Sequence, residues 1–131
     1  MKNPLIIYDS LTGNVDRFAS RLEYRKMKVS PELEIKQPYL LVTYTTGFGE
    51  VPRSTQEFLQ RNHSNLLGVA SSGNKNWGQL FAKSADIISS QYNVPILCKF
   101  ELSGTYNDTE RFIREVNRIV QFNSKVDRIK Q

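Results

Sequence analysis

The chain has 131 residues, of which 39% are hydrophobic, and a formal net charge of +5. This size and composition predict a single domain over residues 1–131 and argue against a disordered chain. A single cysteine excludes an internal disulfide framework, and no apolar run reaches the roughly 20 residues of a membrane span, so we expect a cytoplasmic protein without a membrane partner.

Short apolar runs alternate with helical periodicity in the first half of the chain. Residues 5–8 form a continuous apolar run, which is typical of a strand covered on both faces. A helical stripe follows over 15–22, and a short edge strand is expected near 28–29. Residues 39–44 predict a second buried strand, and Pro52 suits the first turn of the helix after it.

The second half of the chain continues this alternation. Residues 66–70 predict a third buried strand, and 79–92 a helix. A further strand is expected within 94–102, before a final helix for which Asp108 or Thr109 is a plausible N-cap. The alternation predicts an α/β fold with a parallel sheet.

Ligands of such sheets bind beyond the carboxyl ends of the strands. The loops after Tyr8, Tyr44, Ala70 and Leu102 are therefore expected to carry the function. The first three are rich in Gly, Ser, Thr and Asn, and they should open on the same edge of the sheet.

The first loop, "DSLTGNV", enters a helix N-terminus, where free backbone N–H groups and the helix dipole favour an anion. Hydroxyl groups of Ser10 and Thr12 can donate to phosphate oxygens, and Gly13 permits close approach of the backbone. The alternative is an ordinary helix cap. The loop contains neither the P-loop pattern nor the G-x-G-x-x-G dinucleotide pattern.

The second and third loops add a glycine-rich segment and an aromatic residue. "TTGFGEVP" places two glycines around Phe48, either for contact with a flat ligand or for a mobile turn with Phe48 on the core. "SSGNKNWG" carries Trp77, either as a stacking surface or as a closure of the core. A phosphate cradle, a glycine-rich loop and an aromatic plate on one edge together suit flavin mononucleotide (FMN).

Three segments also resemble the flavodoxin-like NrdI family, the flavoproteins that serve class Ib ribonucleotide reductase: "YDSLTGNVDRF", "LVTYTTGFGEVP" and "LLGVASSGNKNWGQLFAKSADIIS". The resemblance runs from Leu5 to about Val120. It implies a flavodoxin-like three-layer sandwich with a five-stranded parallel sheet in the order 2-1-3-4-5. Only about ten residues separate Val29 from Tyr39, so we expect the crossover there to be truncated.

The resemblance also implies the residues that bind the cofactor, FMN. In the first two loops these are Ser10, Leu11, Thr12, Gly13, Asn14, Val15, Tyr44, Thr45, Thr46, Gly47, Phe48 and Gly49. In the third loop they are Ser72, Gly73, Asn74, Trp77 and Gly78. No metal site is expected, because His63 has no cysteine or carboxylate at ligand spacing.

The family's implied role is to activate the reductase. Reduced flavin reacts with dioxygen, and the superoxide produced passes to the dimanganese small subunit, where it drives assembly of the tyrosyl-radical cofactor. The loops contain no obvious catalytic residue, so the chain is expected to be a redox-active accessory flavoprotein, reduced by an unidentified partner, rather than an enzyme with a free substrate. The alternative is a flavodoxin that transfers single electrons. A nucleic-acid partner is not expected, because the aromatic residues follow core patterns.

Overall fold

The structure, a computed structural model, describes residues 4–130, with side chains to residue 125. Its strands are β1 (Leu5–Tyr8), β2 (Lys26–Lys28), β3 (Tyr39–Tyr44), β4 (Leu66–Gly73) and β5 (Ile96–Glu101). All pair in parallel, in the order β2-β1-β3-β4-β5. The predicted α/β class and strand order are therefore confirmed.

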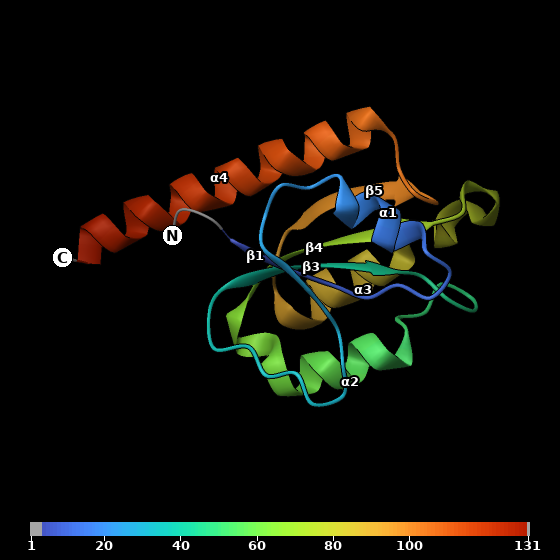
Figure 1. Cartoon of the computed structure of the whole chain (residues 1–131), viewed down its shortest axis with the longest axis horizontal. Coiled ribbons are helices and arrows are strands. Elements are labelled where there is room, and N and C mark those ends of the chain that lie inside the picture. Colours follow the sequence, from blue (N-terminus) through green and yellow to red (C-terminus); the bar gives the residue numbers. More distant parts are fainter. Residues whose placement is uncertain (1–3, 131) are drawn as a thin grey trace.

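Helices cover both faces of the sheet and make three layers (Figure 1). They are α1 (Asn14–Ser20), α2 (Arg53–Asn62), α3 (Lys83–Tyr92) and α4 (Tyr106–Lys130), with 3₁₀ turns at His63–Asn65 and Lys75–Leu80. Within residues 4–130, no helix is long and apolar enough to cross a membrane.

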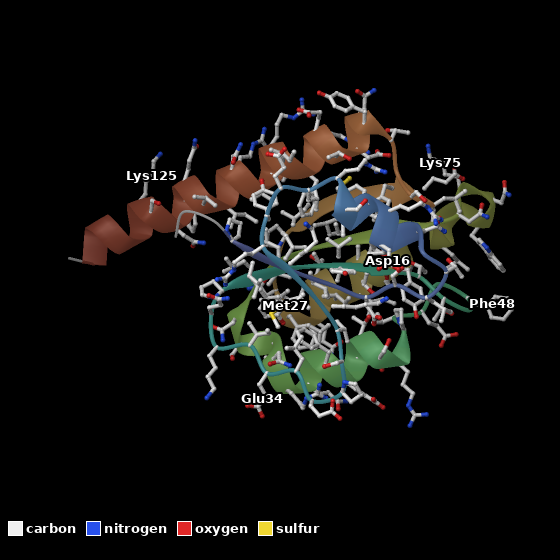
Figure 2. The ribbon with its side chains drawn as sticks, viewed as in Figure 1. Asp16, Met27, Glu34, Phe48, Lys75 and Lys125 are labelled. Atoms are coloured by element: carbon white, nitrogen blue, oxygen red, sulfur yellow. The ribbon has the colours of Figure 1, made fainter. Side chains whose placement is uncertain are left out.

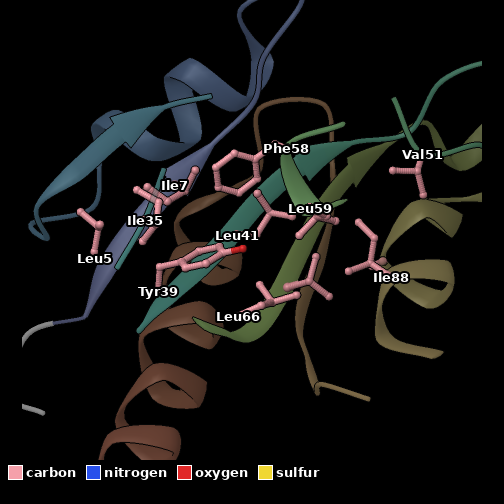
Figure 3. Packing of buried hydrophobic residues seen from close by; sticks show 12 residues of the cluster. Leu5, Ile7, Ile35, Tyr39, Leu41, Val51, Phe58, Leu59, Leu66 and Ile88 are labelled. Carbon is pink, nitrogen blue, oxygen red and sulfur yellow. The ribbon is translucent and has the colours of Figure 1, made fainter. Parts of the chain in front are cut away.

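The core has two halves, one on each face of the sheet. Strand residues such as Ile7 and Leu41 pack with Phe58 of α2 and Ile88 of α3 on one face (Figure 3). On the other face α1 and α4 meet the sheet, and the ring of Phe18 stacks on Phe100 with centroids 4.0 Å apart. Burial of both strand faces explains why the strands read as continuous apolar runs.

The crossover between β2 and β3 contains no helix, as the short spacing predicted. The buried amide of Asn62, at the end of α2, replaces the missing helical hydrogen bonds. Its Oδ1 accepts from the Ile35 N–H at 2.7 Å, and its Nδ2 donates to the carbonyls of Leu33 and Phe58, both at 3.0 Å. Side-chain bonds from a neighbouring helix thus hold the connecting segment, and Ile35 packs into the core.

Two element boundaries after β3 differ from the sequence prediction. β4 continues to Gly73 instead of ending at Ala70, because Ser71, Ser72 and Gly73 pair with β5. Pro52 is the N-cap of α2 rather than a residue of its first turn, with an extended ψ of 143°.

The starts of the last two helices also differ from prediction. α3 begins only at Lys83, because Ala82 adopts a left-handed conformation with φ 49° that interrupts any helix from residue 79. α4 begins at Tyr106, so neither Asp108 nor Thr109 is its N-cap. Thr105 precedes it instead, accepting from the Asp108 N–H at 3.2 Å while the Asp108 carboxylate accepts from the Thr105 N–H at 2.8 Å.

Candidate functional site

A cleft of about 270 Å³ lies at the carboxyl edge of the sheet, where the loops after β1, β3 and β4 meet. These are the three loops that the sequence analysis singled out, and the end of β5 adds a fourth wall. The lining residues are Ser10, Leu11, Thr12, Asn14, Val15, Tyr44, Thr45, Thr46, Gly47, Gly49, Ser72, Gly73, Asn74, Trp77, Leu80 and Leu102.

The loop after β1 is shaped by a left-handed glycine and a hydroxyl cap. Gly13 has φ 93° and directly precedes α1. The Ser10 hydroxyl accepts from the Asp16 N–H at 3.2 Å, so it caps part of the first turn. The Thr12 side chain is exposed at the mouth of the cleft, where it is free to donate to a ligand. The loop therefore offers hydroxyl and amide groups at one end of the cleft.

Arg17, which was not predicted as a site residue, holds this loop in place by hydrogen bonds. Arg17 donates from Nη2 to Asn14 Oδ1 at 2.7 Å and from Nε to the Ser103 hydroxyl at 2.8 Å. The Ser103 hydroxyl in turn donates to Asn14 Oδ1 at 2.8 Å. These contacts connect the loop after β1 to the turn after β5, and they place positive charge beside the polar end of the cleft.

The loop after β3 is a tight turn with an exposed aromatic tip. Thr46 and Glu50 exchange two backbone hydrogen bonds, at 3.0 and 2.7 Å. Phe48, at the tip, is 76% exposed and points away from the body of the protein (Figure 2). Its ring meets the edge of Trp77 at a centroid distance of 5.8 Å. The two rings form part of an exposed apolar rim that also includes Leu11 and Leu102, and neither ring closes the core.

The structure brings fourteen of the seventeen predicted site residues to the cleft wall, and two further residues line it. Gly13, Phe48 and Gly78 do not line it: Gly13 shapes the turn, Phe48 projects outward, and Gly78 forms a kink with φ 57°. Leu80 and Leu102 line the cleft without having been predicted from the sequence. Leu102 follows the end of β5, a position already expected to carry function, whereas Leu80 lay inside a predicted helix and gave no signal.

The residues that line the cleft include no carboxylate, amine, imidazole or thiol. Its one ionisable side chain is the Tyr44 phenol, whose pKa is raised mainly by burial and then by the negative charge of Asp9, with the Ser54 hydroxyl acting in the opposite direction. The phenol therefore stays neutral at physiological pH. The cleft can bind and orient a ligand, but it contains no group poised for proton transfer near pH 7.

Other candidate reactive groups lie away from the cleft. His63 is exposed and its ring stacks on Tyr92, as expected for a surface residue. Burial raises the pKa of the Cys98 thiol to about 11, which fits a buried apolar side chain rather than a nucleophile. Among the residues that the structure describes, no group of three or more His, Cys, Asp or Glu side chains could hold a metal ion.

The sequence matches the family described as "NrdI Flavodoxin like" over residues 6–114. It is 57% identical over 128 residues to the protein NrdI of Bacillus licheniformis. The aligned segment covers 96% of this chain and 98% of the relative. It is 48% identical over 122 residues to the protein NrdI of Macrococcus caseolyticus, covering 92% and 95%.

Solved structures with the same fold are flavodoxins. A short-chain flavodoxin associated with a bacterial microcompartment superimposes with a TM-score of 0.71 and 18% identity, over 93% of this chain and 99% of that one. A Fusobacterium nucleatum flavodoxin bound to flavin mononucleotide gives a TM-score of 0.60 and 18% identity, over 92% and 98%. At such identities the likeness establishes the fold alone.

Proposed function

The chain belongs to the NrdI flavodoxin-like family, and from this premise we propose that it binds FMN and activates a class Ib ribonucleotide reductase. The observation that carries the proposal is the cleft where the three predicted loops meet. Hydroxyl and amide side chains line it together with the larger side chains of Tyr44, Trp77 and Leu102. This donor set fits a ligand with one phosphate group and one flat aromatic ring.

The loop after β1 would hold the phosphate group. The side chains of Ser10, Thr12 and Asn14 line that part of the cleft, and Gly13 and Val15 complete the turn into α1. Arg17 orients the Asn14 amide and adds positive charge, which stabilises a bound dianion. Charge-assisted hydrogen bonds of this kind are about twice as strong as neutral ones, so this end of the cleft would supply much of the affinity.

The other loops would hold the ring. In the loop after β3 the wall is formed by Tyr44, Thr45, Thr46, Gly47 and Gly49, with Phe48 at the rim. At the end of β4 and in the loop after it, the wall is formed by Ser72, Gly73, Asn74 and Trp77, with Gly78 setting the kink that follows. These residues would orient the ring and exclude water from it.

When bound, FMN would supply the redox chemistry, the one-electron reduction of dioxygen to superoxide, which would serve tyrosyl-radical assembly at the dimanganese site of the reductase small subunit. The protein's own residues bind and orient. The lining residues include no carboxylate, amine, imidazole or thiol, which agrees with a site in which the cofactor performs the reaction.

Anaerobic reduction of the FMN-loaded protein, followed by admission of air with the manganese-loaded small subunit present, tests this proposal. We expect a flavin visible spectrum, rapid reoxidation and a tyrosyl-radical signal in electron paramagnetic resonance. FMN binding without any radical would favour a plain electron-transfer flavodoxin. A protein that shows no flavin spectrum after FMN is added would overturn the cofactor assignment as well.

The exposed apolar rim of the cleft is the expected docking surface for the small subunit. Leu11, Phe48, Trp77 and Leu102 are 74%, 76%, 50% and 49% exposed. Most other exposed side chains of this protein are polar or charged, and such a cluster of large apolar groups around one opening is typical of an interface. Docking there would also bring the partner to the open edge of the cleft.

We therefore expect Phe48→Ser to weaken binding to the small subunit by about tenfold or more, because exposed aromatic anchors dominate interface energetics. Titration calorimetry with FMN-saturated protein measures this. Phe122→Ser is the matched control: Phe122 is 66% exposed on α4 and precedes Lys125 by three residues. Figure 2 shows Lys125 at the end of the molecule opposite Phe48. Equal losses in both variants would argue against docking at the rim.

A further inference from the structure

Asp9 is a buried carboxylate that the proposed function leaves without a role. It follows the last residue of β1 and precedes Ser10 of the cleft, yet its side chain is only 6% exposed. Its backbone N–H donates to the Val42 carbonyl at 2.9 Å, so its position is fixed by the sheet. Among the described residues, no Lys, Arg or His nitrogen lies within 4.0 Å of the carboxylate.

Neutral hydroxyl groups are the partners of this carboxylate. The Ser54 and Thr55 hydroxyls both donate to Asp9 Oδ2, at 2.5 and 2.7 Å, and both belong to the first turn of α2. The helix dipole there favours a negative charge. The Thr55 hydroxyl also lies 2.7 Å from that of Thr43 on β3. Asp9 is thus held between β1, β3 and α2 without a counter-ion.

The charge of Asp9 reaches the wall of the cleft. Tyr44 lines the cleft, and the Asp9 carboxylate is one of the causes that raise the pKa of its phenol, after burial. A buried charge without a counter-ion acts over a longer range than one at the surface, because water screens it less. A charge that forms in the cleft near Tyr44 is therefore expected to interact with the Asp9 carboxylate.

We propose that the Asp9 carboxylate sets the balance between oxidised and reduced cofactor in this cleft, by disfavouring the charge that the ring gains on reduction. Two electrons and one proton added to FMN leave one negative charge on the ring. Asp9, which directly precedes the cleft residue Ser10, would repel that charge and lower the midpoint potential. Asp9 is a positioning and electrostatic residue, and this role rests on the proposed binding of FMN.

The experiment measures how tightly each variant binds oxidised and reduced FMN. Fluorescence quenching gives the Kd of oxidised FMN, and titration with dithionite against reference dyes gives the midpoint potential, hence the ratio of the two affinities. Asp9→Asn keeps the shape and removes the charge. We expect it to shift the ratio toward reduced FMN on the order of tenfold, which corresponds to two unit charges about 12 Å apart at an effective dielectric constant near 20.

For a second variant we expect the ratio of the two affinities to shift in the opposite direction. Thr55→Val removes one donor to Asp9 and keeps the charge, so the carboxylate is less neutralised and the ratio should move toward oxidised FMN by about threefold. Glu57→Gln is the matched control, since Glu57 lies on the same helix but its side chain is 55% exposed. We expect it to leave the ratio within about twofold, because water screens an exposed charge.

The outcomes separate this inference from the proposed function. If the unaltered protein binds no FMN, both fail. If it binds FMN and Asp9→Asn leaves the ratio unchanged, or if Asp9→Asn and Thr55→Val shift it in the same direction, only the role of Asp9 is overturned. Thermal unfolding of each variant shows whether a loss of structure accompanies the change.

Discussion

Replacing Gly73 by alanine is expected to destabilise the folded chain by about 2–3 kcal/mol, the usual cost of forcing extra volume into a packed core. A Cβ at this position would lie 2.5 Å from the backbone nitrogen of Ala82 and 3.0 Å from its Cα. The Ala82 carbonyl accepts from the Ala85 N–H, and the Gly73 carbonyl accepts from the Leu102 N–H at 3.0 Å. Neither backbone can move away without breaking these bonds.

Gly73 also lines the cleft, so this variant is expected to lose ligand affinity together with stability. Urea unfolding and FMN titration measure the two losses. Gly68→Ala is the matched control on the same strand, because the three atoms nearest to a Cβ there are side-chain atoms of Ile119 and Leu97, at 3.3 Å. We expect it to cost less than about 1 kcal/mol, since those side chains can adjust. Equal stability of the two variants would show that the backbone at Ala82 can shift at little cost to make room for the added methyl group.

Asn62→Ala is expected to cost about 3 kcal/mol, because it leaves buried backbone groups without partners. Asn62 is 3% exposed, and its amide forms hydrogen bonds with backbone groups of Ile35, Leu33 and Phe58. Alanine removes all three hydrogen bonds and leaves the Ile35 N–H without its acceptor. Urea unfolding of the purified variant measures the loss in the free energy of unfolding.

Asn65→Ala provides the comparison. Asn65 is half-buried and makes one hydrogen bond to the same segment, from Nδ2 to the Ile35 carbonyl at 3.0 Å. Its replacement should cost about 1 kcal/mol. A loss from Asn62→Ala no larger than that from Asn65→Ala would mean that core packing of Ile35, rather than the amide, holds the connecting segment in place.

Much of this fold was predictable because buried parallel strands leave a strong pattern. β1 and β3 coincide with the apolar runs at 5–8 and 39–44. The boundaries that were wrong depend on partners far away in the sequence. Ser71, Ser72 and Gly73 have little strand character of their own, and they extend β4 because β5 lies beside them.

The candidate site was predictable as a set of loops but not in its details. Parallel topology alone brings the loops after Tyr8, Tyr44 and Ala70 to one edge. Side-chain direction is not encoded locally, so Phe48 could not be assigned to the rim, nor Leu80 to the wall. Which of these residues contact FMN stays a prediction.

The crossover without a helix also leaves the β2 edge of the sheet less stable than its centre. β2 pairs only with β1, and over three residues, while the segment that follows it depends on amide side chains instead of a repeating backbone ladder. This edge can open locally at less cost than β3 and β4, which pair on both sides. Native-state amide exchange at the edge would then be governed by its own small opening equilibrium, and a ligand in the cleft would slow exchange in the centre of the sheet without slowing it at the edge.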